Sequence, residues 1–103
     1  MEPKDIYSEK PWLKFYPEGI PASIDYEEIC LHDVLERTVS KYGKTDALIF
    51  QGFRIDYNGL SDMVNRLAYF LSSRGVKKGD VVAILLPNMI QTVAAYYASL
   101  KIG

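Results

Sequence analysis

Six consecutive apolar residues, Val81–Leu86, constrain the fold of this chain more than any other feature of its sequence. A strand with one face in water alternates apolar and polar side chains, whereas a strand covered on both faces is apolar throughout. The polar turn Val76–Asp80 precedes the run and Pro87 ends it, since proline cannot donate to a sheet. The run therefore predicts one buried, parallel-type strand in a fold of the α/β class.

Helical periodicity surrounds this strand. Apolar residues recur on one helix face over residues 30–42, 57–74 and 89–102, so we expect three amphipathic helices there. Asp56 and Asn88 stand immediately before the second and third helices, where their side chains can cap the first backbone N–H groups.

A small hairpin is expected between the first two helices. Residues 47–50 and 53–56 are rich in apolar and β-branched side chains, and Gln51-Gly52 between them is typical of a tight turn. Gly43 is expected to end the first helix in a left-handed conformation, and Gly75 to close the second. Gly59, in the first turn of the second helix, is unfavourable by up to about 1 kcal/mol relative to alanine.

Residues 1–29 have a different character and contain four of the five prolines. Proline biases its neighbours toward extended backbone, which predicts an irregular strap rather than a helix. Its many aromatic and aliphatic side chains make it too apolar to remain solvated, so we expect it to lie across the folded body, pinned by Trp12. The chain thus divides into a strap, 1–29, and an incomplete α/β portion, 30–103.

Composition excludes several classes of protein. A net charge of −1 lacks the basic excess of a nucleic-acid binder. A single cysteine allows no internal disulfide, and the acidic, polar start has no signal-peptide core. The longest apolar run, six residues, falls far short of the roughly 20 that a membrane helix needs. We expect a cytoplasmic protein with no nucleic-acid partner and no transmembrane segment.

The best candidate for a metal or catalytic site is the group around His32, the only histidine. Cys30, Asp33 and Glu36 are its neighbours, and His32 and Glu36 have the i,i+4 spacing of two ligands on one helix face. No CxxC or HxxxH pattern supplies further ligands. An exposed histidine at a helix start is the commoner arrangement, and apolar neighbours on both sides of Cys30 favour a small buried residue over a nucleophile.

Phosphate-binding chemistry has equally weak support, because the seven glycines fit neither GxxxxGK[ST] nor GxGxxG. The lysines of Lys77–Asp80 favour a solvated turn, and Tyr96–Tyr97 favours helix packing over ligand contact. The carboxylates Asp25, Glu27 and Glu28 lie in the strap without any sign of a cleft. No catalytic, cofactor-binding or metal-binding residue is therefore assigned.

Several stretches, at matching spacing, resemble the opening of the AMP-forming acyl-CoA synthetases, a branch of the adenylate-forming superfamily: Leu31–Thr38, Tyr42–Phe50, Asp56–Tyr57 with Leu60, Asn65–Ala68, Gly75–Asp80, Val82–Asn88, Ala95–Ala98 and Leu100–Gly103. The strap segment Pro11–Pro21 is similar to the lead-in of the long-chain fatty-acid branch. The resemblance covers nearly the whole chain. Gly59 departs from the family, where an acidic residue is usual after the helix cap.

This resemblance implies an enzyme that activates a carboxylate with ATP to acyl-AMP and transfers the acyl group to coenzyme A. The family's catalytic segments follow the region that this sequence matches. The chain is thus expected to be a scaffold fragment of the large N-terminal domain of a fatty-acid–CoA ligase, inactive alone, with ATP, Mg²⁺ and coenzyme A bound by the full-length parent. The alternative is a short natural protein that acts as a self-associating or synthetase-binding interaction module.

Overall fold

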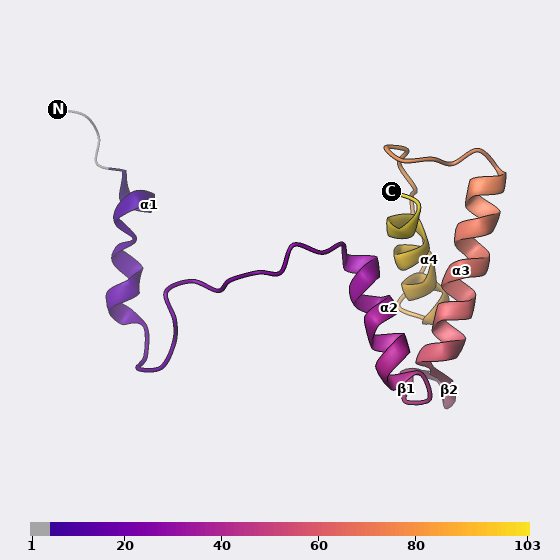
Figure 1. Ribbon diagram of the computed structural model, residues 1–103, viewed down its shortest axis with the longest axis horizontal. Helices are drawn as coiled ribbons and strands as arrows, with labels where there is room; N and C mark the ends of the chain where they lie inside the picture. The colour runs from indigo at the N-terminus through magenta and orange to yellow at the C-terminus, as the bar shows by residue number, and fades with distance from the viewer. Residues whose placement is uncertain (1–4) are drawn as a thin grey trace.

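The structure is a computed structural model that describes residues 5–103 (Figure 1). It contains a small three-helix body with an antiparallel hairpin, and an N-terminal strap with two short helical segments. The elements in chain order are α1 (Ile6–Glu9), the 3-10 helix η1 (Pro11–Phe15), α2 (Leu31–Tyr42), β1 (Asp46–Phe50), β2 (Phe53–Asp56), α3 (Tyr57–Ser73) and α4 (Ile90–Lys101).

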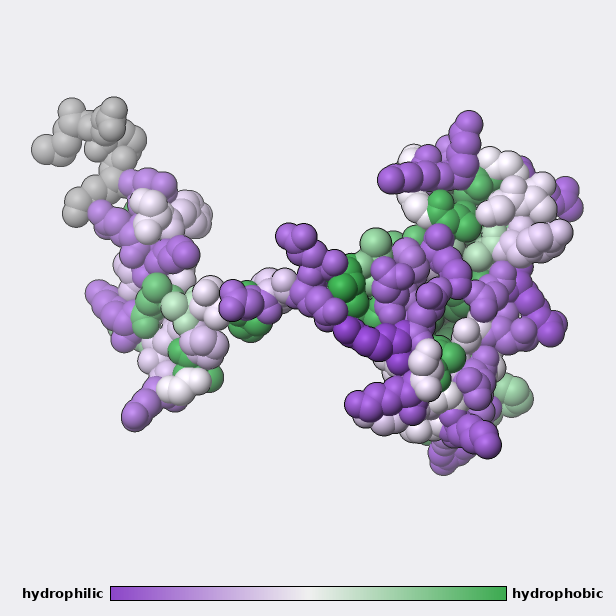
Figure 2. Space-filling view, in the orientation of Figure 1, coloured by the Kyte–Doolittle hydropathy of each residue, from purple (hydrophilic) through white to green (hydrophobic). Residues whose placement is uncertain are grey.

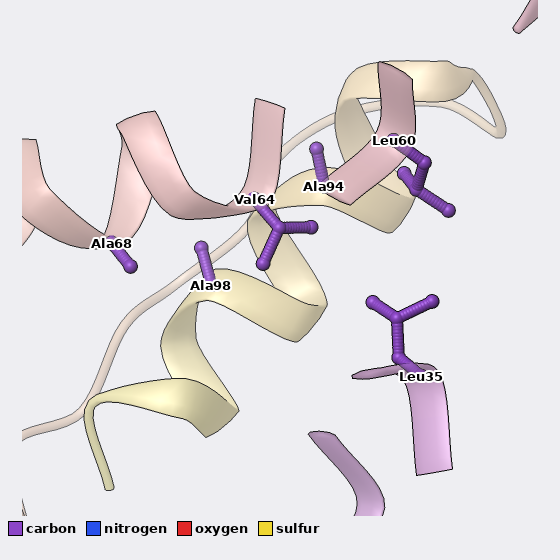
Figure 3. Packing of buried hydrophobic residues seen from close by; sticks show 6 residues of the cluster. All are labelled: Leu35, Leu60, Val64, Ala68, Ala94 and Ala98. Atoms are coloured by element: carbon purple, nitrogen blue, oxygen red, sulfur yellow. The ribbon is translucent and has the colours of Figure 1, made fainter. Parts of the chain in front are cut away.

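The three long helices form at the predicted places and bury one shared core. In Figure 3, Leu60, Val64 and Ala68 of α3 point toward Ala94 and Ala98 of α4, while Leu35 approaches from α2. Ala98 is fully buried, and small side chains at such positions let two helices lie close together. Leu35 is the one described residue of α2 in the buried core, so this helix is the least firmly attached of the three.

The predicted hairpin is confirmed. β1 and β2 pair antiparallel, with Phe50 opposite Phe53. Gln51 and Gly52 both have positive φ, 49° and 79°. Positive φ at both positions is what a two-residue hairpin turn requires if it is to match the twist of its strands. Figure 1 shows the hairpin at the end of the body where α2 finishes and α3 begins.

Helix ends follow the predictions in part. The Asp56 cap of α3 is confirmed, since its carboxylate accepts a 2.7 Å hydrogen bond from the Gly59 N–H. The Asn88 cap is wrong, because Met89 occupies the N-cap of α4 without a side-chain bond. Gly43 is right-handed rather than left-handed, and its carbonyl accepts from the Asn58 N–H. The Asn58 side chain fills the space that a Cβ would need there, so Gly43 allows a close approach of the α2 end to α3.

The parallel-type strand is wrong for this chain. Val81–Leu86 has no strand conformation, and the described residues supply it with no backbone hydrogen bonds. The only sheet described is the antiparallel hairpin. Val82 and Ile84 are half-buried, whereas Val81 is 94% exposed and Leu85 is 99% exposed. A strand requires a neighbour to receive its N–H and C=O groups, and the described residues place none beside this segment.

The strap is also placed differently from the expectation. Instead of lying across the body it projects away from it (Figure 1), which gives the described chain a long dimension of 57 Å against 33 and 26 Å. Its first part is helical rather than irregular, because Asp5 caps α1 and Pro11 occupies the first position of η1, where no donor is needed. Trp12 packs near the Tyr7 ring, with centroids 6.3 Å apart, rather than on the body.

Candidate functional site

The N-terminal turn of α2 brings three of the predicted ligand candidates together. One ligand atom from each of Cys30, His32 and Asp33 lies within 4.8 Å of the others. The Asp33 carboxylate accepts from the Cys30 N–H at 3.3 Å, and its other oxygen lies 3.4 Å from His32 Nε2. Cys30 and Asp33 form a reciprocal capping box, which stabilises the first turn of a helix. The arrangement is explained by helix capping without a metal.

Two expectations about this cluster need correction. Cys30 is exposed rather than buried, because at the N-cap its side chain turns back to the first helical turn and not to the core. Glu36 does not join His32. Its carboxylate instead accepts a 2.6 Å hydrogen bond from Lys101 at the end of α4.

Lys101 forms an interhelical clamp that sequence reasoning missed. Its ammonium donates to Glu36 of α2 at 2.6 Å and to Asn65 of α3 at 2.7 Å, so one side chain connects all three long helices. The partners lie 65 and 36 residues away along the chain. Local spacing rules reach only three or four residues, so no signal in the sequence could have found them.

The turn Lys77–Asp80 does not fit a phosphate. The Lys77 N–H donates to the Asp80 carboxylate at 2.9 Å, and the Asp80 N–H donates to the Lys77 carbonyl. The Gly79 N–H donates to the Gly103 carbonyl at 3.2 Å. A phosphate cradle needs free N–H groups that converge on an anion, and three of the N–H groups in this turn already have partners. Both lysines are exposed, as expected for a solvated turn.

The remaining candidates serve the fold. The Tyr96 and Tyr97 rings meet edge to face at 5.6 Å, and Tyr97 packs against the core. Glu27 accepts from Arg37 at 2.9 and 3.0 Å and so ties the strap to α2. Within residues 5–103 these groups do not form a catalytic arrangement with one another, and the assignment of no catalytic, cofactor or metal residue stays a prediction.

Large exposed apolar side chains are numerous in the described residues, and three regions of exposed apolar surface stand out. The first is the segment Val81–Leu86. The second, here named the hairpin groove, is a hollow of about 440 Å³ lined by Phe50, Phe53, Met63, Met89, Ile90 and Gln91. The third is the strap, and Figure 2 shows hydrophobic residues among hydrophilic ones on both strap and body. Among the described helices, none has the length and apolar character required to cross a bilayer.

Comparison with known proteins supports the resemblance. The chain is 35% identical to a long-chain-fatty-acid–CoA ligase of Bacillus subtilis over 95% of its own length, and 33% identical to one of Yersinia pestis over 92%. It spans only 18% and 17% of those proteins. An acetoacetyl-coenzyme A synthetase of Rhizobium meliloti is 37% identical over 66% of the chain. Residues 35–103 match the family model described as AMP-binding enzyme, and the chain therefore belongs to the AMP-binding enzyme family.

Proposed function

We propose that this chain is scaffold of an ATP-dependent fatty-acid–CoA ligase, and that it has no ligase activity by itself. The activity concerned joins a fatty acid to ATP as acyl-AMP and then transfers the acyl group to coenzyme A in the cytoplasm. The proposal rests on relatives named as long-chain-fatty-acid–CoA ligases, of which this chain spans less than a fifth. ATP, Mg²⁺ and coenzyme A are then bound by parts of the ligase outside this chain.

One observation carries the scaffold role: the apolar segment Val81–Leu86 lies largely in water. Burial of a large aliphatic side chain is worth about 1.5–3 kcal/mol relative to exposure. Leu85, at 99% exposed, and Val81, at 94%, gain nothing of this kind from residues 5–103. Further strands of a ligase domain would cover both side chains and would satisfy the backbone groups of the segment.

A chimeric ligase tests the proposal. This chain replaces the aligned region of the Bacillus subtilis ligase, and fatty-acid-dependent ATP–pyrophosphate exchange is measured. We expect exchange from the chimera and none from the 103-residue chain alone. The chimera with Leu85→Lys should lose activity, whereas the chimera with Tyr69→Lys, which alters another exposed side chain, should keep it. Exchange by the isolated chain, or equal activity in both variants, would contradict the scaffold role.

The alternative function is an interaction module, and it is favoured by the apolar side chains exposed on both strap and body. An antibody against the segment around Trp12 distinguishes the two in the source cell. A full ligase gives a band several times larger than 11.7 kDa, whereas a free-standing module gives a band at 11.7 kDa. The second result would direct attention to whatever protein covers Val81–Leu86.

A further inference from the structure

We infer that the side chains of Cys30, His32 and Asp33 bind a zinc ion at the start of α2. This inference is independent of the ligase activity proposed above. The sequence pattern left these residues unassigned, because no CxxC or HxxxH pattern adds further ligands. The structure adds their convergence, since one ligand atom from each residue lies within 4.8 Å of the other two.

The three side chains offer a set of donor atoms that suits zinc. A cysteine sulfur, an imidazole nitrogen and a carboxylate oxygen are the ligands that zinc takes in proteins, in a tetrahedron whose open position holds water. Magnesium and calcium prefer oxygen ligands alone, so the sulfur and nitrogen atoms select against both ions. A thiolate and a carboxylate together neutralise the double charge of the ion. We therefore expect a site of three protein ligands completed by water.

The distance between His32 and Asp33 already matches a zinc site. The His32 Nε2 atom lies 3.4 Å from the Asp33 Oδ1 atom. This separation is longer than that of a good hydrogen bond, about 2.7–3.2 Å. Two ligand atoms at about 2.0–2.2 Å from a tetrahedral ion lie about 3.3–3.6 Å from each other. Zinc can therefore bind both atoms without a change in their separation.

The capping box of α2 holds the carboxylate in place and leaves the thiol adjustable. The Asp33 Oδ2 atom accepts from the Cys30 N–H, which leaves Oδ1 for the ion. The His32 side chain is only 25% exposed, so its ring has few other positions, whereas Cys30 is exposed. A Zn–S bond of about 2.3 Å places the sulfur about 3.6 Å from the other ligands, so it has to approach them by at most about 1.2 Å. A small rotation of an exposed side chain completes the site.

Titration of the reduced chain with cobalt(II) is the first test, because cobalt accepts the ligands of zinc and absorbs light when a thiolate binds it. We expect one ion per chain, a tetrahedral cobalt spectrum with a thiolate charge-transfer band, and displacement of the cobalt by zinc. Cys30→Ser should abolish that band although serine is a good N-cap and preserves the helix. His32→Ala should raise the dissociation constant for zinc at least about tenfold. Glu36→Gln is the matched control and should leave it unchanged, because that carboxylate binds Lys101.

Thermal unfolding gives a second measurement that does not depend on cobalt. Zinc should raise the Tm of the unaltered chain but not that of Cys30→Ser, since an ion that binds the folded state stabilises it. Circular dichroism establishes that each variant is folded. A cobalt spectrum without the thiolate band, or zinc binding that His32→Ala leaves intact, overturns the inference. So does one ion to two chains, which would show a metal that bridges two copies through Cys30 rather than a site within one chain.

Discussion

Replacement of Lys101 by methionine should weaken the body through a contact that no local pattern predicts. Methionine keeps most of the apolar stem but removes the ammonium that donates to Glu36 and Asn65. The Lys101 side chain is 31% exposed and that of Glu36 is 51% exposed, so solvent screens the ion pair, and we assign it about 0.5 kcal/mol. The hydrogen bond to the neutral Asn65 amide adds a similar amount, about 0.5 kcal/mol.

Lys101→Met should therefore lower the free energy of unfolding by about 1 kcal/mol, which corresponds to a fall in Tm of roughly 4–8 °C for a domain of this size. Denaturant and thermal unfolding followed by circular dichroism measure both quantities. Arg66→Met is the matched control, because it removes an ion pair within one helix, at 80% and 58% exposure, worth about 0.3–0.5 kcal/mol.

A double-mutant cycle with Glu36→Gln isolates the ion pair itself. We expect a coupling energy of about 0.5 kcal/mol at low salt, which declines toward zero near 1 M salt, where the screening length is about 3 Å. Equal Tm values for Lys101→Met and Arg66→Met would refute the view that the clamp holds α2 to the other helices. So would additive effects of the Lys101 and Glu36 changes at low salt.

Three further substitutions test the body by unfolding measurements. Gly59→Ala should lower the free energy of unfolding by about 1 kcal/mol, although alanine favours a helix more than glycine does. The reason is that the new Cβ would lie 2.8 Å from the branched Ile55 side chain. A gain in stability would contradict this packing. Asp56→Ala removes the 2.7 Å cap of α3 and should cost about 1 kcal/mol, with Asp56→Asn restoring most of it. Ala98→Leu should destabilise by about 1–3 kcal/mol because the site is fully buried between α3 and α4, and an unchanged Tm would show that the helices separate freely.

Features set by neighbouring residues were predictable from the sequence. The three long helices follow from apolar periodicity, the hairpin from Gln51-Gly52, and the cap of α3 from Asp56. Each depends on interactions that span at most a few residues, which a pattern in the sequence can represent. The same reasoning classed Gly59 as a defect of the helix, although the structure gives it a packing role against Ile55.

Features that depend on which of several possible partners a residue takes were not predictable. Apolar flanking residues indicated that Cys30 is buried, but at the N-cap its side chain turns back to the first turn of α2 and stays exposed. The spacing of His32 and Glu36 suggested a pair, yet Glu36 binds Lys101, a partner that only the packing of α4 brings near. Trp12 was expected on the body, but it packs with Tyr7 on the strap. Each residue type was compatible with several neighbours. Tertiary packing selected the partner of Glu36, whereas Cys30 and Trp12 took nearby partners, Asp33 and Tyr7.

The segment Val81–Leu86 is a different kind of failure, because its pattern was interpreted by a valid physical rule. Six apolar residues in sequence indicate a strand covered on both faces, but only Val82 and Ile84 of the six are half-buried. Leu85 remains in water. Strand conformation is a property of a hydrogen-bonded pair, so one chain segment cannot have it without a neighbour. The composition of the segment thus specifies an environment that residues 5–103 do not supply. A second chain segment laid against it would restore the predicted strand, which is why the effect of Leu85→Lys in a complete ligase, rather than in this chain, decides the proposed role.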